Sequence, residues 1–192
     1  AKNNVDLIIS LDCGIKSVDK VAYAQSLGID FIICDHHTPG DIIPDAIVLD
    51  PKQKDCEYPY KELSGCGVGF KLLQALCEHN NWGQEKLLDS LDLLAVSIGA
   101  DIGHVTGENR ILALHGMKKL NENPRFAFKT LLTLAKKEFP VTLTDVIFSI
   151  AQRINAAGRL RSGKYAVELM ISGNTSEISD LAEDINADNL ER

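Results

Sequence analysis

The chain has 192 residues, of which 45% are hydrophobic and 24% are charged, and its formal net charge is −7. This composition is typical of a soluble globular domain with a sizeable core. The acidic balance excludes a surface coated with phosphate-binding lysines, although it permits a local basic groove. No apolar run approaches the roughly 20 residues of a membrane span, and five cysteines without a C-x-x-C pair favour a reducing, cytoplasmic location.

Three strands are predicted in the first part of the chain. Residues 5–12 form a nearly continuous apolar run, which is typical of a buried parallel strand, and residues 31–35 and 46–50 are the next two strands. A helix is predicted over residues 17–27, with Gly28 as its C-terminal stop. This pattern predicts an α/β fold with a parallel, doubly wound sheet and flanking helices.

Helical periodicity dominates the rest of the chain, so a largely helical C-terminal part is expected. We expect a sheet portion over about residues 1–60 and a helix-rich portion over about residues 61–192, whose last helix would link to another domain. The expected helices cover residues 67–80, 84–99, 107–121, 125–138, 142–155, 163–172 and 175–191.

The stretch from Gly65 to Gly69 resembles a dinucleotide-binding loop. However, Phe70 stands where that motif needs glycine, and no strand directly precedes the stretch. Close packing of a helix is the better interpretation.

Carboxylates and histidines follow the three predicted strands. Asp12 ends the first strand, Asp35, His36 and His37 follow the second, and Asp50 ends the third. Because ligands bind at the carboxyl ends of parallel strands, we expect these side chains to lie close together. Mixed Asp and His ligands suit manganese, zinc or iron, and a carboxylate can bridge two ions about 3.5–4 Å apart that cleave phosphate esters. The alternative is that these residues only form turns.

Two later stretches carry further candidates. Asp101 follows an apolar helix and is either another ligand or a surface residue at a helix end, and His104 lies nearby in the sequence. The stretch IAQRINAAGRLRSGK at 150–164 carries four basic residues, with no acidic residue from Val146 to Val167. In an acidic chain this cluster indicates phosphate contacts, the alternative being a solvated loop.

The motifs and their order resemble the DHH phosphoesterase superfamily. The matching stretches are LDCGI at 11–15, CDHH at 34–37, AD at 100–101 with GENRIL at 107–112, and RINAAGR at 153–159. The last of these, together with GCGVGFKLLQAL at 65–76, is similar to the RecJ-like single-strand-specific exonucleases within the superfamily. The resemblance covers essentially the whole chain, so residues 1–192 are identified as part of a DHH catalytic domain.

The resemblance implies two divalent metal ions, manganese or magnesium. By position, Asp12 would bridge the ions, and His36 and Asp101 would be ligands. His37 would lie by the scissile phosphate, and Asp35 would orient a histidine from behind.

The resemblance also assigns substrate contacts and a reaction. Arg159, Arg153 and Asn155 would contact phosphates of the substrate. The reaction would be 5′→3′ hydrolysis of single-stranded DNA in repair and recombination, and single-strand-binding protein and a helicase would be partners. The alternatives are a phosphoesterase acting on short oligonucleotides or cyclic dinucleotides, and a catalytically dead scaffold.

The first motif of the family, D-x-D-x-D-G, and its C-terminal domains are absent from residues 1–192. Since a catalytic ion pair needs both ions held in geometry, we expect this chain alone to have little or no nuclease activity.

Overall fold

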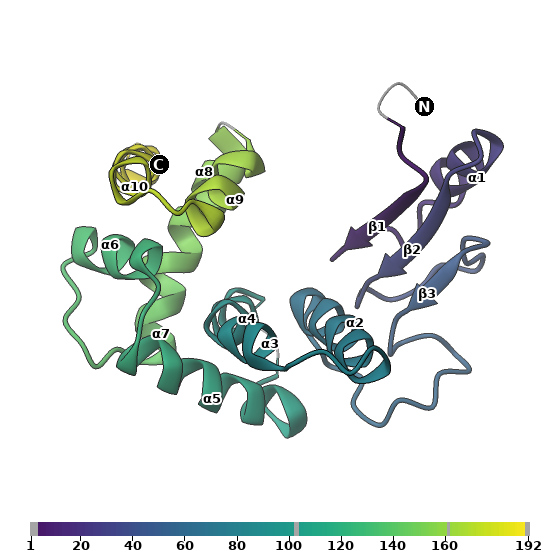
Figure 1. The fold of residues 1–192 in the computed structure, drawn as a ribbon, viewed down its shortest axis with the longest axis horizontal. Coiled ribbons are helices and arrows are strands. Elements are labelled where there is room, and N and C mark those ends of the chain that lie inside the picture. Colours follow the sequence, from purple (N-terminus) through teal and green to yellow (C-terminus); the bar gives the residue numbers. More distant parts are fainter. Residues whose placement is uncertain (1–3, 102–103, 161, 191–192) are drawn as a thin grey trace. The chain divides into compact units, whose positions relative to one another are not determined.

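A computed structural model describes residues 4–101, 104–160 and 162–190, with the side chains of residues 159, 160 and 190 excepted (Figure 1). The chain forms two compact units. The first comprises Ala1–Asp89 and Gly103–Ile111, and the second comprises Ser90–Ile102 and Leu112–Arg192. Within the described part of the chain, no helix is both long enough and apolar enough to cross a membrane.

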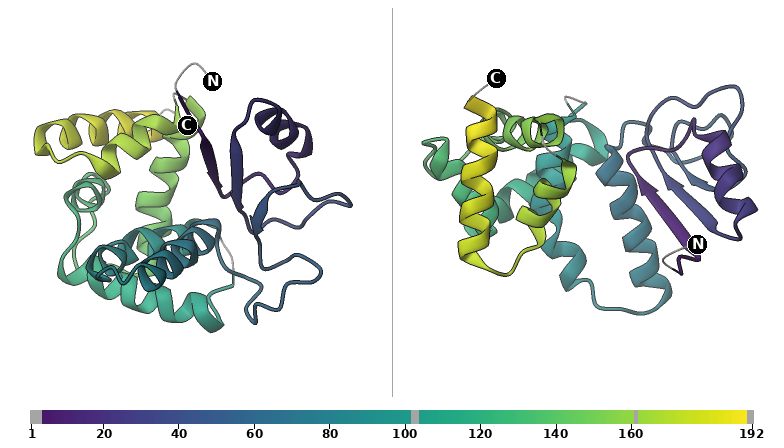
Figure 2. Two further views of the ribbon diagram at one scale, coloured as in Figure 1. Left: turned by 45° about the vertical axis from the view of Figure 1, so that its right-hand side comes forward. Right: turned by 90° about the horizontal axis from the view of Figure 1, so that it is seen from above.

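The first unit is built on a parallel sheet with the strand order β1-β2-β3. The strands are β1 (Leu7–Leu11), β2 (Asp30–Cys34) and β3 (Ile47–Leu49). Helices α1 (Val18–Ser26) and α2 (Gly65–His79) cover opposite faces of the sheet (Figure 2). The predicted α/β class, a parallel sheet with flanking helices followed by a helical part, is confirmed.

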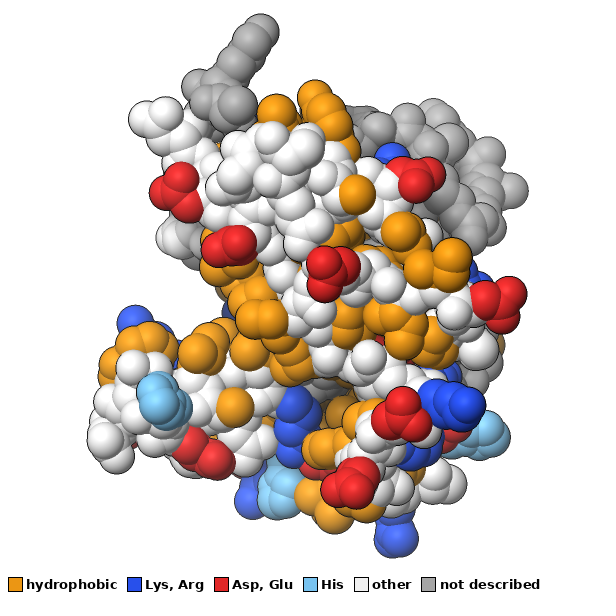
Figure 3. All heavy atoms as spheres, turned by 90° about the vertical axis from the view of Figure 1, so that its right-hand side faces the viewer, with side chains coloured by type: hydrophobic (Ala, Val, Ile, Leu, Met, Phe, Trp, Pro, Cys, Tyr) orange, Lys and Arg blue, Asp and Glu red, His pale blue; other side chains and the backbone are white. Residues whose placement is uncertain are grey.

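The burial of β1 differs from the sequence-based expectation. In the described sheet β1 is an edge strand, and Leu7, Ile9 and Leu11 are all exposed. An apolar run does not distinguish an edge strand from a central one, because that depends on which strand pairs with it. Exposed hydrophobic side chains also lie among acidic ones on the face shown in Figure 3.

The predicted end of α1 is confirmed, whereas α2 begins at Gly65, two residues before the start expected at residue 67. Gly28 follows α1 with φ +74°, the left-handed conformation that glycine adopts without strain. Ser64 caps α2, because its side chain accepts a hydrogen bond from the Gly67 amide at 3.1 Å. Gly69 lies one turn further along and faces Leu11 of β1, so the expectation of close helix packing is met there.

The remaining helices follow the predicted ranges with several differences in where they begin, break and end. They are α3 (Glu85–Asp89), α4 (Leu91–Ala100), α5 (Gly107–Glu122), α6 (Phe126–Leu134), α7 (Leu143–Val146), the π-helix η1 (Ile147–Ala151), α8 (Gln152–Leu160), α9 (Gly163–Ile171) and α10 (Thr175–Leu190). The single helix expected over 84–99 is divided at Ser90. The helix expected to end at residue 155 continues to Leu160, so Gly158 lies inside α8 rather than in a loop.

The second unit has its own hydrophobic core. Its largest fully buried members come from α5, α6, η1, α9 and α10 and include Phe128, Leu131, Ile150, Leu169 and Ile185. A buried carboxylate ties α4 to α6 in this unit, since Asp92 accepts two hydrogen bonds from Arg125, at 2.8 and 2.9 Å. Helix α10 packs against both α6 and α8.

Candidate metal centre

The parallel pairing brings the ends of the strands to one edge of the sheet. Leu11 pairs with Cys34, and Cys34 pairs with Leu49. The next residues extend the ladder, because the Asp12 amide donates to Cys34 O at 2.9 Å and the Asp35 amide donates to Leu49 O at 3.0 Å. Asp12 and the Asp35–His37 stretch therefore leave the sheet side by side, as the spacing of the strands predicts.

His36 and Asp12 form the closest pair at this edge. Nε2 of His36 lies 3.1 Å from Oδ1 of Asp12. On the other side of the ring, Nδ1 lies 3.1 Å from the carbonyl oxygen of Leu63. Because a carbonyl oxygen only accepts hydrogen bonds, Nδ1 carries a hydrogen, and Nε2 is the nitrogen that faces Asp12.

Two acceptor atoms at 3.1 Å need a cation between them, either a proton or a metal ion. Ligands at right angles on an ion with bonds of about 2.1 Å would be about 3 Å apart. Asp12, His36 and His37 each offer one ligand atom, and these atoms lie within 4.8 Å of one another. The donor set and its spacing therefore fit a divalent ion that accepts mixed oxygen and nitrogen ligands.

Asp35 lies behind the histidines and is 1% exposed. Its carboxylate accepts hydrogen bonds from the amides of Ile15, His36 and His37, at 2.9, 2.8 and 3.2 Å, and from Nδ1 of His37 at 2.7 Å. Burial alone would raise the pKa of the Asp35 carboxyl, but these hydrogen bonds outweigh burial and leave the pKa below its ordinary value. The ionised carboxylate thus fixes the orientation of the half-exposed His37 ring.

Asp50, at the end of β3, lies in a different environment. It is 3% exposed, Oδ1 accepts from the Lys52 amide at 2.8 Å, and Oδ2 is buried without a hydrogen-bond partner among the described residues. Burial raises the pKa of the Asp50 carboxyl, and the charge of Asp35 acts in the same direction. Asp50 does not belong to the cluster of potential ligands, although it follows the neighbouring strand.

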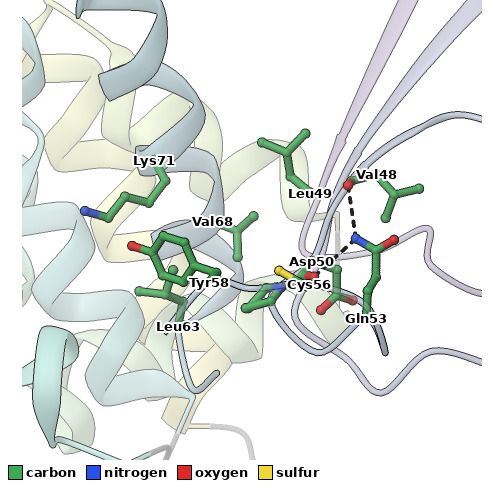
Figure 4. A pocket seen from close by; sticks show the side chains of 10 residues that line it. Val48, Leu49, Asp50, Gln53, Cys56, Tyr58, Leu63, Val68 and Lys71 are labelled. Atoms are coloured by element: carbon green, nitrogen blue, oxygen red, sulfur yellow. Dashed lines mark hydrogen bonds between the residues drawn. The ribbon is translucent and has the colours of Figure 1, made fainter. Parts of the chain in front are cut away.

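A pocket of about 320 Å³ lies between the end of β3 and helix α2 (Figure 4). Its lining is mainly apolar and includes Val48, Leu63 and Val68. The polar groups at Tyr58 and Lys71 are engaged elsewhere, because both side chains contact the carboxylate of Glu108. Leu63 thus has two functions in the first unit, lining this pocket and accepting the hydrogen bond of His36.

Asp101 and His104 come from the sequence around the end of α4. Asp101 is exposed at the C-cap of α4 in the second unit, and it stays a predicted ligand. His104 belongs to the first unit, where its carbonyl accepts from Tyr60 and Asn109. The described ligand cluster does not include the His104 side chain.

The three predicted phosphate contacts all belong to α8. Arg153 is 7% exposed, and its guanidinium donates to Asn186 Oδ1 at 2.9 Å and to Ser149 O at 2.8 Å. These contacts join α8 to α10 and η1, so Arg153 has a structural role that does not require contact with a substrate. Asn155 is exposed, and the side chain of Arg159 lies outside the described residues.

Sequence reasoning missed the groups that hold the ligands in place. The carbonyl of Leu63 and the amide of Ile15 are backbone atoms, so no residue type marks them. Gly65 is different, because the G-C-G-V-G stretch signalled a close approach without showing what approaches it. A side chain at Gly65 would overlap Asp12.

Comparison with known proteins agrees with this geometry. Residues 2–98 match the DHH family, N-terminal domain. The single-stranded-DNA-specific exonuclease RecJ of Bacillus subtilis is 38% identical over 188 residues, covering 97% of this chain and 23% of that protein. Crystal structures of RecJ from Thermus thermophilus align with TM-scores of 0.86 in complex with Mn²⁺ and 0.76 in complex with Mg²⁺, at 30% and 27% identity.

Each of these alignments covers 97% of this chain, but only 28% and 26% of the crystallised chains. The chain thus spans about a quarter of the length of each of these three relatives. Its sequence and its parallel sheet agree with one family. The chain belongs to the DHH family, within which it is similar to the RecJ exonucleases over nearly its whole length.

Proposed function

We propose that this chain forms part of the catalytic region of a metal-dependent exonuclease that degrades single-stranded DNA from its 5′ end. The observation that carries the proposal is the pair of acceptors at the sheet edge, Nε2 of His36 and Oδ1 of Asp12, 3.1 Å apart. The similarity to RecJ supports the substrate class, and the RecJ structures with Mn²⁺ and Mg²⁺ support the choice of ion.

Three residues are proposed to hold two divalent ions, manganese or magnesium. They are Asp12, His36 and Asp101. When bound, such ions activate a water molecule for attack and stabilise charge on the leaving oxygen. The hydrogen bond from Nδ1 to Leu63 O makes Nε2 the nitrogen of His36 that would hold the ion.

His37 and Asp35 are proposed to act together on the scissile phosphate. Asp35 holds Nδ1 of His37 at 2.7 Å, which leaves Nε2 on the exposed side of the ring. Since Nδ1 donates to Asp35, only the imidazolium form of His37 carries a hydrogen on Nε2, and that form would donate it to a phosphoryl oxygen as negative charge develops there. Asp35 contributes through the orientation of His37 and has no direct contact with substrate in this proposal.

Residues of α8 are proposed to contact substrate phosphates. Arg159 and the exposed Asn155 are the principal candidates. The hydrogen bonds of Arg153 support a role in joining helices, so a contribution of Arg153 to phosphate binding would require only part of its guanidinium.

The test measures metal-dependent digestion of 5′-labelled single-stranded DNA. The full-length protein should release nucleotides in the presence of Mn²⁺, and His36→Ala should lower the rate by at least about 100-fold. This chain alone should show little or no activity. Robust digestion by this chain, abolished by His36→Ala, would contradict that last expectation but support the site.

Substrate choice is tested in the same assay. Long single-stranded DNA is compared with dinucleotides and cyclic dinucleotides at equal concentrations of scissile bonds. Preference for the short substrates would contradict the exonuclease proposal and favour a phosphoesterase that acts on short oligonucleotides or cyclic dinucleotides. A full-length protein without activity on any of them, at a Mn²⁺ concentration that saturates the site, would favour the scaffold.

A further inference from the structure

Helix α2 begins directly beside Asp12. Gly65 is the first residue of this helix, and a Cβ atom added to it would lie 2.6 Å from Cβ of Asp12 and closer still to its carboxylate. Real Cβ atoms essentially never approach another heavy atom this closely. The space taken by the Asp12 carboxylate therefore exists only because residue 65 has no side chain.

The backbone on each side of this contact is held in place. Asp12 has φ +63°, an uncommon conformation for a residue with a side chain, and its amide is bonded to Cys34 O at 2.9 Å. On the other side, Leu63 and Ser64 are each 2% exposed, and the Ser64 side chain caps α2. Rotation of the Asp12 side chain would move its carboxylate but not its Cβ, so an added methyl group at residue 65 would also force Asp12 or the start of α2 to shift.

Such a displacement would change the spacing of the two acceptors that define the metal centre. The carboxylate now lies 3.1 Å from Nε2 of His36. The ring of His36 is fixed independently, because its Nδ1 is bonded to Leu63 O. The carboxylate would thus be displaced relative to the ring, and the pair would lose its 3.1 Å spacing.

We propose that Gly65 is a positioning residue for the metal centre. Together with Leu63 it forms a short segment that sets both members of the acceptor pair: the carbonyl of Leu63 orients His36, and the empty side-chain space at Gly65 sets the direction of the Asp12 carboxylate. This inference rests on the proposed metal site and adds what holds two of its proposed ligands in position.

The experiment compares Gly65→Ala with Gly67→Ala. Both glycines lie in the first turn of α2 and neither has a positive φ, so the two substitutions change helix propensity alike. A Cβ at Gly67 would meet nothing closer than Ser64 Oγ at 3.3 Å, which makes it a matched control. The measurements are the Mn²⁺ dissociation constant, from the electron paramagnetic resonance signal of the free ion, and circular dichroism in EDTA.

Gly65→Ala should weaken Mn²⁺ binding by about 10–100-fold, the usual effect of disturbing the support of a ligand. Gly67→Ala should stay within about threefold of wild type, and both variants should keep the wild-type dichroism spectrum. Wild-type affinity in Gly65→Ala would overturn the inference. Wild-type affinity in His36→Ala would instead overturn the metal site itself, so the two failures are distinguishable.

A double-mutant cycle covers the case in which Gly65→Ala folds poorly. Asp12→Gly removes the side chain that the new methyl group would meet and suits the positive φ at that position. In metal-free protein, Gly65→Ala should therefore lower the unfolding midpoint in the wild-type background but not in the Asp12→Gly background. An equal decrease of the unfolding midpoint in the two backgrounds would show that Gly65 is not needed to avoid contact with the Asp12 side chain.

Discussion

Asp35 is the residue on which the geometry of the candidate site depends most. It accepts hydrogen bonds from three amides and from one imidazole nitrogen, although it is almost fully buried. A buried carboxylate is tolerated when its oxygens are satisfied in this way. The same contacts order the loop at Ile15 and aim His37, so folding and function share this residue.

Replacing Asp35 tests that dependence. Asp35→Asn keeps the shape but gives one of the two oxygen positions to a donor, which would then face the donors that now bind there. We expect the free energy of unfolding to fall by about 2–3 kcal/mol, the cost of losing a hydrogen bond to a charged group in a buried place. Chemical denaturation in EDTA measures it, and a variant as stable as wild type would show that the hydrogen bonds of Asp35 contribute nothing net.

Asp50 should respond in the opposite direction. Its carboxyl has a raised pKa, so the folded state favours the neutral form, and wild-type stability falls as the pH rises from the unfolded value, about 3.9, through the folded value. Asp50→Asn keeps an acceptor for the Lys52 amide and removes the buried charge. We expect this variant to be more stable at pH 7, by on the order of 1 kcal/mol.

The pH dependence is the decisive part of the Asp50 experiment. The advantage of Asp50→Asn should shrink as the pH is lowered and should vanish about one pH unit below the unfolded pKa of about 3.9, where the wild-type carboxyl is neutral in both states. Denaturation curves across this range measure the difference. An advantage that does not change with pH would point to packing instead of charge.

At the level of the elements, the sequence predicted those features that are determined within a single strand or helix. Apolar runs followed by Asp12 and Asp35 revealed the strands and the direction in which the ligands lie, since parallel strands end at one edge. The exposure of β1, the break at Ser90 and the π-helix η1 were not predicted. Each of these depends on partners distant in sequence, as when Asp92 in the first turn of α4 pairs with Arg125.

The sequence is also insufficient to predict how closely helices pack, as a crowded and an uncrowded glycine illustrate. A Cβ at Gly116 in α5 would overlap the Leu91 carbonyl and would lie 2.6 Å from Ala95 Cβ, so α5 and α4 are in close contact there. A Cβ at Gly158 in α8 would meet nothing within 4 Å. The sequence shows a glycine in both places and does not show which one is crowded.

We expect Gly116→Ala to destabilise the protein by about 1–3 kcal/mol through overpacking. Gly158→Ala should stabilise it by about 0.5–1 kcal/mol, because alanine favours the interior of a helix and no neighbour has to move. Urea denaturation followed by circular dichroism measures both. Changes of the same sign in the two variants would contradict the packing of α4 against α5.

At the scale of the whole chain, the compact units do not coincide with the sheet and helix-rich portions expected from sequence. Helix α2 packs on the sheet, and the segment Gly103–Ile111 returns to the first unit, where Asn109 donates to Glu62 O. Periodicity identifies a helix but not the surface on which it packs. The ligand cluster described here lies wholly within the first unit.

This location leads to a prediction for hydrogen exchange. Metal that binds the folded state stabilises it by RT ln(1 + [L]/Kd), about 2.7 kcal/mol at 100 times the dissociation constant. In saturating Mn²⁺, exchange should slow most in peptides of the first unit that contain Ile15, His36 and His37, whose amides are bonded to Asp35. If Asp101 is a ligand as predicted, the peptide that contains its amide, bonded to Ser97 O, should slow as well. His36→Ala serves as the control and should remove all of these effects, whereas unchanged exchange at the strand ends of the wild-type protein would place the bound metal elsewhere.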